Sequence, residues 1–313
     1  MSRVNRCLEL LEQDQPIYYG SPALSPLSGH GMYVVEDLTY ENGMANAITS
    51  FDYLSIDFEH APFDMGALQA FMKGLRDGGP TRSGHATPTV IATLPSSGRS
   101  ADMVLMNQWQ ITHLLNTGVH GLILCHVSDP AAVRAFVECC RFAYRGLANG
   151  DQLGPGRRGS GGQNFPAEIW GLEPEEYMHR ADPWPLSSDG ELLLGLKIED
   201  RECLVYADQL VSVPGVGFAE WGPGDMGMSF GKAVSHDPPY SAEMMDAMQI
   251  VCNATQSAGI PFLSGWNDQA LSAQERAKYA IEEIGAKIIP TGGTDAEELM
   301  MAGRQLTNRE MPV

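Results

Sequence analysis

Short apolar runs alternate along this chain with longer stretches of helical periodicity, and this alternation limits the fold more than any other feature. Each run is short enough to be a buried strand, and a helical pattern or a long loop follows it. The expected strands are 18–19, 53–58, 89–93, 121–125, 192–198, 216–221, 261–263 and 287–290. The expected helices are 64–77, 102–117, 129–143, 200–211, 241–258, 272–284 and 294–306, after a first amphipathic helix that begins near Leu8.

Eight strand–helix units are the number found in a (β/α)8 TIM barrel. The alternative α/β architecture, a doubly wound sheet, seldom needs eight units and usually has a glycine-rich first turn. No GxGxxG or GxxxxGK[ST] pattern follows any expected strand. Although 313 residues correspond on average to about two domains, α/β barrels of this size fold as one unit. We therefore predict an α/β protein with a single (β/α)8 TIM-barrel domain over residues 1–313.

Two stretches rich in glycine and proline, residues 21–46 and 145–190, interrupt the repeat. They follow the first and fourth expected strands and carry several Met, Tyr and Trp residues. Loops this long are uncommon in compact domains unless they have a function. We expect both to lie over the active-site face of the barrel, because that face is built from the loops that follow the strands. The simpler alternative is that they are surface loops or linkers.

The charge balance excludes several classes of partner. The chain has 20 Lys and Arg against 39 Asp and Glu, which gives a formal net charge of −19. We expect neither nucleic acid nor membrane as a partner, because such a surface repels phosphates and anionic lipids. No apolar run approaches the roughly 18 residues of a membrane span. The six cysteines form no CxxC pair, and adjacent Cys139 and Cys140 suit a helix core, so we expect a reduced, cytoplasmic enzyme.

The carboxyl ends of barrel strands are where catalytic residues gather. Glu199 follows the fifth expected strand and Asp225 follows the sixth, so their carboxylates can converge. Two carboxylates without a further Cys or His ligand suit a hard divalent ion, Mg²⁺ or Mn²⁺, better than Zn²⁺. Taken singly, Glu199 could favour a helix start and Asp225 could cap a helix. Together they predict a metal site.

Three ordered segments resemble motifs of the HpcH/HpaI aldolases, which are metal-dependent (β/α)8 pyruvate aldolases. Residues 56–62 (IDFEHAP) resemble the IDxEHxP motif of strand two in that family. Residues 198–202 (IEDRE), preceded by Lys197, resemble its QIExxE motif. Residues 222–231 (GPGDMGMSFG) resemble its GPxDLSxxxG motif, and the likeness extends over essentially the whole chain.

The resemblance implies a metal and substrate site. Glu199 and Asp225 would hold the metal, which would chelate an α-keto acid and stabilise the developing enolate. The backbone N–H groups of Gly224 and Asp225, in the turn that begins at Gly222, would bind the carboxylate of the substrate.

His60 would assist proton transfer, since the pKa of a histidine lies near neutrality. Without the surrounding motif we would interpret His60 as a hydrogen-bonded core histidine. Asp57 shares a strand face with Glu59, and these acids would orient His60 or a metal-bound water.

Two positions depart from the family pattern. The family usually has an arginine at the end of strand three that stabilises the enolate oxygen, but residues 90–95 here read VIATLP. The family also commonly has an aspartate in the next helix, paired with the catalytic histidine, where this chain has Asn116. We expect the uncharged Asn116 to leave His60 less basic.

Lys197 is a candidate replacement for the missing positive charge. Lys197 and Glu199 are two residues apart, so strand alternation directs both side chains into the barrel. Lys197 would act on the enolate oxygen, or would only form a salt bridge to Glu199 or Glu59. A Schiff-base role needs a lowered pKa, which two neighbouring carboxylates would oppose.

Three further side chains complete the predicted site. Arg158 is a second candidate for the catalytic cation, and Arg99 is a weaker one. His126, at the end of strand four, would line the substrate pocket, although it could equally pack in the core.

The predicted activity is that of a carbon–carbon lyase that cleaves or forms a 4-hydroxy-2-keto acid through a metal-stabilised pyruvate enolate. One alternative uses the same site for decarboxylation, hydrolysis or condensation on a larger substrate, aromatic ones included. Another is a non-catalytic binding protein that has kept the fold. The predicted partner is a small α-keto acid, and the resemblance implies a homo-oligomer, a hexamer in which a terminal helix packs on a neighbour.

Overall fold

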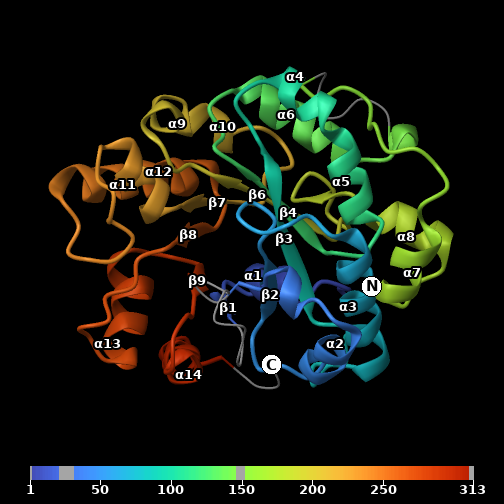
Figure 1. Ribbon diagram of the computed structural model, residues 1–313, viewed down its shortest axis with the longest axis horizontal. Coiled ribbons are helices and arrows are strands. Elements are labelled where there is room, and N and C mark those ends of the chain that lie inside the picture. Colours follow the sequence, from blue (N-terminus) through green and yellow to red (C-terminus); the bar gives the residue numbers. More distant parts are fainter. Residues whose placement is uncertain (1, 21–31, 146–151, 310–313) are drawn as a thin grey trace.

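A closed barrel of parallel strands forms the core of the computed structural model, which describes residues 2–20, 32–145 and 152–309 (Figure 1). The barrel strands are β1 (Ile17–Tyr19), β2 (Tyr53–Ile56), β3 (Thr89–Ser97), β4 (Gly121–Cys125), β6 (Leu192–Lys197), β7 (Phe218–Trp221), β8 (Phe262–Ser264) and β9 (Ile288–Pro290). Their spatial order is β4-β3-β2-β1-β9-β8-β7-β6, and pairing of β4 with β6 closes the ring. The predicted (β/α)8 TIM barrel and its eight strands are therefore confirmed.

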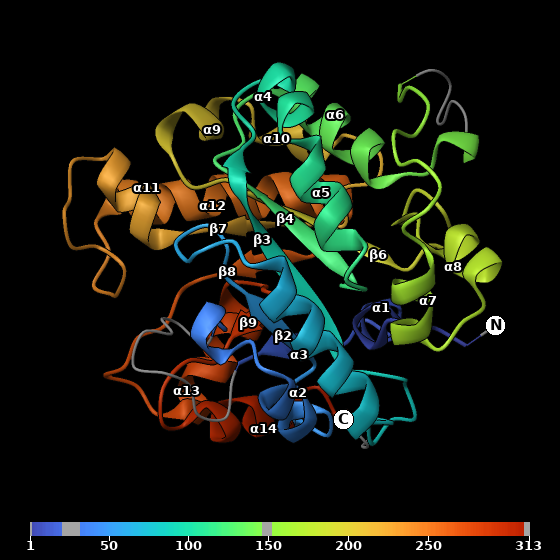
Figure 2. The same cartoon turned by 45° about the vertical axis from the view of Figure 1, so that its right-hand side comes forward.

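Helices surround this barrel on its outer side, as Figure 2 shows from a second direction. Three expected helices are interrupted. The stretch 102–117 forms two helices that meet at Asn107, the stretch 200–211 breaks at Tyr206, and the stretch 272–284 ends in a π-helical turn. The helices are α1 (Arg6–Glu12), α2 (Tyr40–Asn46), α3 (Met65–Gly78), α4 (Ala101–Met106), α5 (Gln108–Leu115), α6 (Pro130–Cys140), α7 (Asn164–Trp170), α8 (Pro174–Arg180), α9 (Arg201–Val205), α10 (Ala207–Val211), α11 (Pro223–Ser229), α12 (Ala242–Ala258), α13 (Ala273–Lys278) and α14 (Ala296–Leu306), with short turns η1 (Val35–Asp37), η2 (Ala143–Arg145) and η3 (Tyr279–Glu283).

The interior of the barrel is packed with side chains from every strand. One buried cluster contains at least one residue from each of the eight strands, so it fills the lumen rather than the layer under the helices. Gly195 on β6 makes room for it, because a Cβ atom there would lie 2.2 Å from the ring of Phe218. Helix α1 contributes to the same cluster and closes the end of the barrel where the strands begin. A substrate can therefore enter the barrel only from the opposite end, at the carboxyl ends of the strands.

Asn5 ties α1 to that closed end. Its side chain accepts a hydrogen bond from Thr89 Oγ1 at 2.8 Å and donates one to the carbonyl of Glu191 at 3.0 Å. The Glu191 carboxylate in turn accepts from the backbone N–H of Asn5 at 2.9 Å and pairs with Arg180 at 2.5 Å.

The stretch 145–190 differs from the expected long loop. It contains α7, α8 and a short extra strand, β5 (Pro183–Trp184), that pairs with β6. Trp170 of α7 donates to the carbonyl of Gly118 at 2.8 Å and stacks on His120, just before β4 begins. These helices therefore pack near the amino ends of the strands, with α7 next to α1 in Figure 2, and no described residue of 145–190 lines the active-site cavity described below.

In the other predicted loop, residues 21–31 lie outside the described residues. Residues 32–46 turn back onto the barrel, where Tyr33 forms a β-bridge with Ile56. Helix α2 then packs closely on α3 through glycines, since a Cβ atom on Gly74 would lie 2.1 Å from the carbonyl oxygen of Tyr40. The part of this stretch that reaches the active-site face is Met32 and Val34, which line the cavity described below.

A buried ion triad fastens the C-terminal helix to the barrel. Asp52, just before β2, pairs with Arg304 of α14 at 3.1 Å and also with Arg309. Its carboxylate accepts a further hydrogen bond from the backbone N–H of Tyr18 at 2.9 Å. All three charged side chains are buried.

No helix among the described residues is long and apolar enough to cross a bilayer. The six cysteines are buried free thiols, and Cys139 and Cys140 lie in α6 as expected.

Candidate metal and substrate site

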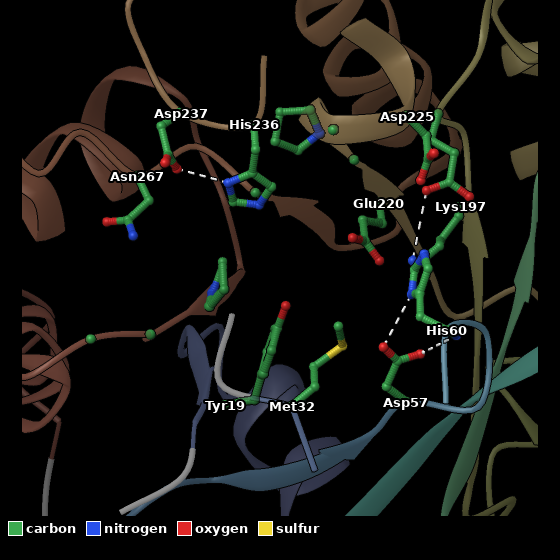
Figure 3. A pocket seen from close by; sticks show the side chains of 18 of the residues that line it. Tyr19, Met32, Asp57, His60, Lys197, Glu220, Asp225, His236, Asp237 and Asn267 are labelled. Atoms are coloured by element: carbon green, nitrogen blue, oxygen red, sulfur yellow. Dashed lines mark hydrogen bonds and ion pairs between the residues drawn. The ribbon is translucent and has the colours of Figure 1, made fainter. Parts of the chain in front are cut away.

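A cavity of about 570 Å³ lies at the carboxyl ends of the strands (Figure 3). This is the end of a TIM barrel where active sites are found, and the volume suits a small organic molecule. Seven of the nine predicted site residues line it: Asp57, His60, Lys197, Glu199, Gly222, Gly224 and Asp225. His126 lies beside it among the acids, and Arg158 does not reach it.

Four side chains from four strand ends converge at one side of the cavity. Glu59, His126, Glu199 and Asp225 each offer a ligand atom, and these atoms lie within 4.8 Å of one another. Glu199 and Asp225 thus meet as the sequence suggests. Glu59 and His126 join them, which makes the cluster larger than the two-carboxylate site that the sequence indicates.

Local structure brings Glu199 and Asp225 together. Glu199 lies two residues beyond the end of β6, where its Oε1 atom accepts a hydrogen bond from the backbone N–H of His126 at 3.1 Å. Asp225 is the third residue of α11, which begins after β7 with Gly222 as its N-cap. A side chain at Gly222 would obstruct the pair, because its Cβ atom would lie 2.8 Å from Glu199 Oε2.

The buried Lys197 balances part of this negative charge. Its Nζ lies 2.5 Å from Glu59 Oε2 and 3.7 Å from Glu199 Oε2. Burial alone would lower the pKa of Lys197, but Glu199, Glu220 and Glu59 raise it well above the ordinary value. Lys197 is therefore an ammonium ion, and a Schiff-base role for it is disfavoured.

The pKa values of the two acids nearest the Lys197 ammonium shift in opposite directions. Burial raises the pKa of Glu199, and the nearby charges of Glu59 and Glu220 raise it further. Burial would also raise the pKa of Glu59, but His126 and Lys197 hold it well below its ordinary value. The resistance of one carboxylate to ionisation indicates that the positive charge in the site does not balance the negative charge of its acids.

His126 occupies an unusual backbone position between the acids. Its φ of +47° lies in the left-handed region, which few residues other than glycine adopt. Its Nε2 is 3.3 Å from Glu59 Oε1, and its Nδ1 is 3.6 Å from both Glu199 Oε1 and Asp200 Oδ2. The carboxylates of Asp200 and Glu59 raise the pKa of His126 to about 10.

A divalent metal ion fits this cluster. The donor set is dominated by carboxylate oxygens, which hard cations prefer. Glu59 Oε1 is buried without a hydrogen bond among the described residues, so the cluster has an oxygen atom available as a metal ligand. A cation would also supply the positive charge that Glu199 lacks.

Asp57 and His60 form a pair next to the acid cluster. His60 Nδ1 lies 3.1 Å from Asp57 Oδ2, and Asp57 Oδ1 accepts the backbone N–H groups of Glu59 and His60. The hydrogen bond to Asp57 raises the pKa of His60. The His60 side chain is 57% exposed to the cavity and solvent, whereas Asp57 is buried beneath it.

Two expectations about this part of the site were wrong. Asn116 is not the partner of His60, since it ends α5 and lines a different pocket with Met65 and His113. Because Asp57 takes that place, His60 is more basic than an isolated histidine, not less.

Arg158 is a structural residue in this fold. It is buried, its guanidinium lies 4.1 Å from the ring centroid of Phe142, and its Nη2 donates to the hydroxyl of Tyr177 at 3.0 Å. Arg99 pairs at the surface with Asp200 at 2.9 Å and Glu202 at 2.7 Å. The described lining of the cavity therefore contains Lys197 but no arginine.

The cavity has a second wall that the sequence analysis missed. His236, Asp237 and Asn267 lie across from Lys197 and His60, and Glu220 projects between the two walls (Figure 3). Strand alternation could have predicted the position of Glu220. Phe218, two residues earlier, faces the barrel interior, so Glu220 faces inward as well. Residues of the other wall come from loops, which carry no comparable periodicity.

The closed barrel and its cluster of acids define the class of protein as a TIM barrel with a candidate metal site. Residues 100–289 match the family described as HpcH/HpaI aldolase/citrate lyase, and the chain belongs to this family. It is accordingly an enzyme of the carbon–carbon lyase class, in a family that depends on divalent metal ions.

Known proteins resemble the chain over most of its length. It is 28% identical over 257 residues to a hydroxypyruvate/pyruvate aldolase of Deinococcus radiodurans, covering 82% of this chain and 76% of the relative. It is 26% identical over 248 residues to a 4-hydroxy-2-oxo-heptane-1,7-dioate aldolase of Klebsiella pneumoniae, covering 77% and 75%. A crystal structure of a family protein from Burkholderia cenocepacia superposes with a TM-score of 0.64 at 19% identity, over 96% of this chain and 97% of that one.

Proposed function

We propose that this lyase is a class II pyruvate aldolase, which cleaves or forms a 4-hydroxy-2-keto acid with pyruvate as one product or reactant. The single observation that carries the proposal is the convergence of Glu199 and Asp225 with Glu59 and His126, directly beside the Asp57–His60 pair. The names of the Deinococcus and Klebsiella relatives support the substrate class.

We assign Glu199 and Asp225 as the principal metal ligands, with Mg²⁺ or Mn²⁺ as the ion. When bound, the ion would act as a Lewis acid toward the carboxylate and keto oxygens of the substrate and stabilise the negative charge of the enolate. The first N–H groups of α11, at Gly224 and Asp225, make no bonds within the helix and would receive the substrate carboxylate. Gly222 and His126 complete this substrate-binding set.

His60 is the proposed proton-transfer residue. In the cleavage direction its neutral ring would accept the proton of the 4-hydroxyl group as the carbon–carbon bond breaks. Asp57 contacts Nδ1, so it fixes the tautomer that leaves Nε2 free to accept this proton, and its carboxylate stabilises the imidazolium that results.

Lys197 would act electrostatically. Lys197 is part of the described cavity lining, which contains no arginine. Glu59, at 2.5 Å, holds the ammonium in position. We assign to Lys197 the stabilisation of negative charge on the keto oxygen, a role that needs a permanent charge rather than a nucleophilic amine.

An assay of pyruvate release tests the proposal. The chain is incubated with a 4-hydroxy-2-keto acid after EDTA treatment, and then with Mg²⁺ or Mn²⁺ restored. Pyruvate release that EDTA abolishes and metal restores is the expected result. Release that EDTA does not affect would contradict the metal site, and metal binding without release would contradict the aldolase assignment.

We further propose that the chain works in the cytoplasm as a homo-oligomer, a hexamer by its family resemblance. The six buried free thiols support a reducing compartment. Exposed apolar residues such as Met106 and Trp109 support contact with another subunit.

A further inference from the structure

The Glu220 carboxylate faces the cavity without a partner. Burial raises its pKa, and no hydrogen bond or ion pair to its side chain exists within residues 2–20, 32–145 and 152–309. In the barrel register Glu220 is aligned with Lys197 on the neighbouring strand, yet the ammonium of Lys197 bonds to Glu59 instead. A partly buried acid with no protein partner is available to a ligand.

The wall opposite the acid cluster offers neutral donors. The amide oxygen of Asn267 accepts a hydrogen bond from Arg276 Nη1 at 2.7 Å, so the amide nitrogen remains as a donor. Gln269 lines the cavity beside it. Across the gap, Glu220 supplies only acceptors. Hydroxyl groups suit both partners, because a hydroxyl can donate to a carboxylate and accept from an amide.

The charges around the cavity oppose an anion at this end. Its described lining contains five acids, with Lys197 as the only lysine or arginine, and His236 is engaged by Asp237 at 2.7 Å. Lys197 lies on the side of the metal cluster, where the keto acid is expected. A second carboxylate on the substrate would therefore meet the negative charge of Glu220, while the nearby ammonium of Lys197 is already bonded to Glu59. The acids are Asp57, Glu199, Glu220, Asp225 and Asp237.

We propose that Glu220 determines the specificity of the subsite for the aldehyde half of the substrate, and that this subsite takes an uncharged, hydroxylated aldehyde in preference to one that carries a carboxylate. This inference rests on the pyruvate aldolase function proposed above. Glu220 accepts a hydrogen bond from a hydroxyl of the aldehyde, and its charge repels anionic aldehydes.

Competition between acceptor aldehydes tests the role of Glu220. The full-length chain with Mn²⁺ and saturating pyruvate is given glyceraldehyde, propanal or succinic semialdehyde, and kcat/KM is measured for each aldehyde. Ratios between aldehydes are compared, because any effect of a substitution on enolate formation cancels in them. The wild-type chain should prefer glyceraldehyde to propanal, and both to succinic semialdehyde.

Two substitutions separate charge from hydrogen bonding. Glu220→Gln should raise the ratio of succinic semialdehyde to glyceraldehyde by about tenfold, since it removes the repulsion. Glu220→Leu should lower the ratio of glyceraldehyde to propanal by about tenfold, the effect of losing one hydrogen bond to a charged group. Glu243→Gln, a change to an exposed acid on α12, should keep the wild-type ratios.

Unchanged ratios in both Glu220 variants would overturn the inference. A preference of the wild-type chain for succinic semialdehyde would also overturn it, and this measurement does not depend on the folding of any variant. Exchange of the pyruvate methyl protons with deuterated water reports on the underlying function. If the wild-type chain exchanges them but the ratios do not move, only the role of Glu220 fails. If no exchange occurs, the pyruvate aldolase proposal fails.

Discussion

At the scale of single residues, the pair of Asp57 and His60 controls a proton in the proposed site. The Asp57 carboxylate is buried and bonds to the ring of His60, which is itself exposed to the cavity. Such a pair raises the pKa of the histidine and selects one tautomer of its neutral form. Both effects depend on the negative charge of one side chain.

Replacing that charge should move the pH profile of the enzyme. If neutral His60 is the base, kcat/KM rises as pH increases through the pKa of His60, which Asp57 holds above its ordinary value. Asp57→Asn removes the carboxylate, so the acidic limb of kcat/KM should shift to lower pH while the maximum falls. Steady-state rates across pH measure this. A smaller maximum with an unmoved limb would mean that Asp57 only supports the structure.

His60 itself should carry a large share of the rate. His60→Gln removes general acid–base catalysis, which contributes about 10²- to 10⁴-fold in comparable enzymes, so kcat should fall by that order. Affinity for Mn²⁺ should change little, because His60 is not among the assigned metal ligands. A variant that loses metal binding together with activity would contradict the division of roles between His60 and the acids.

At the scale of elements, His120 links β3 and β4 to α7 at the closed end of the barrel. Its Nδ1 accepts the backbone N–H of Val90 at 3.2 Å, and its ring stacks on Trp170 with 5.2 Å between centroids. Burial lowers the pKa of His120 to about 3, so the folded chain keeps this ring neutral. Protonation would create a positive charge in a buried place, and protonation at Nδ1 would remove the atom that accepts the backbone N–H of Val90.

The stability of the fold should therefore fall as pH decreases below the ordinary histidine pKa of about 6.5. Between that value and about 3, the unfolded state binds a proton at His120 that the folded state excludes. His120→Gln should reduce the loss of unfolding free energy between pH 7.0 and 5.5 by about 1 kcal/mol, measured by urea denaturation. The exposed His113→Gln serves as control, and equal slopes in both variants would contradict the prediction.

Short helices were the elements that the sequence did not reveal. Helices α7 and α8 have seven residues each, too few to be stable alone, and glycines and prolines flank them. Trp170 bonds to Gly118 just before β4 and Tyr177 bonds to Leu115 of α5, and such contacts between residues distant in sequence leave no periodic pattern. The strands were predictable because each is a short run in which most residues are buried.

The residues of the site also divide into those that the sequence could predict and those that it could not. Glu199 and Asp225 were predictable because they follow strands that meet in any parallel barrel. Glu220 was predictable in principle from strand alternation. Arg158 was misassigned because a charge in a loop does not indicate its partners, and here they are the rings of Phe142 and Tyr177.

At the scale of the whole molecule, the triad of Asp52, Arg304 and Arg309 joins the C-terminal helix and the residues after it to the start of β2. Asp52 is buried between the two arginines, which come from α14 and the segment after it. The last barrel unit is thus held by charge as well as by apolar packing.

Removing Asp52 should destabilise the entire domain. Asp52→Ala leaves two buried guanidinium groups without their partner, and breaking such a pair costs about 3–5 kcal/mol. The midpoint of urea denaturation should fall accordingly, whereas Asp246→Ala, at an exposed acid of α12, should change the unfolding free energy by less than about 0.5 kcal/mol. A normal midpoint for Asp52→Ala would show that the triad adds nothing to the fold.

The binding of Mn²⁺ to the purified chain, followed by electron paramagnetic resonance, tests the central claim most directly. The acid cluster predicts one bound ion per wild-type chain, no specific binding in the variant that combines Glu199→Gln with Asp225→Asn, and wild-type binding in Glu202→Gln, an exposed acid outside the cluster. Circular dichroism confirms that each chain is folded. Undiminished Mn²⁺ binding in the folded double variant would contradict the claim that Glu199 and Asp225 hold the metal.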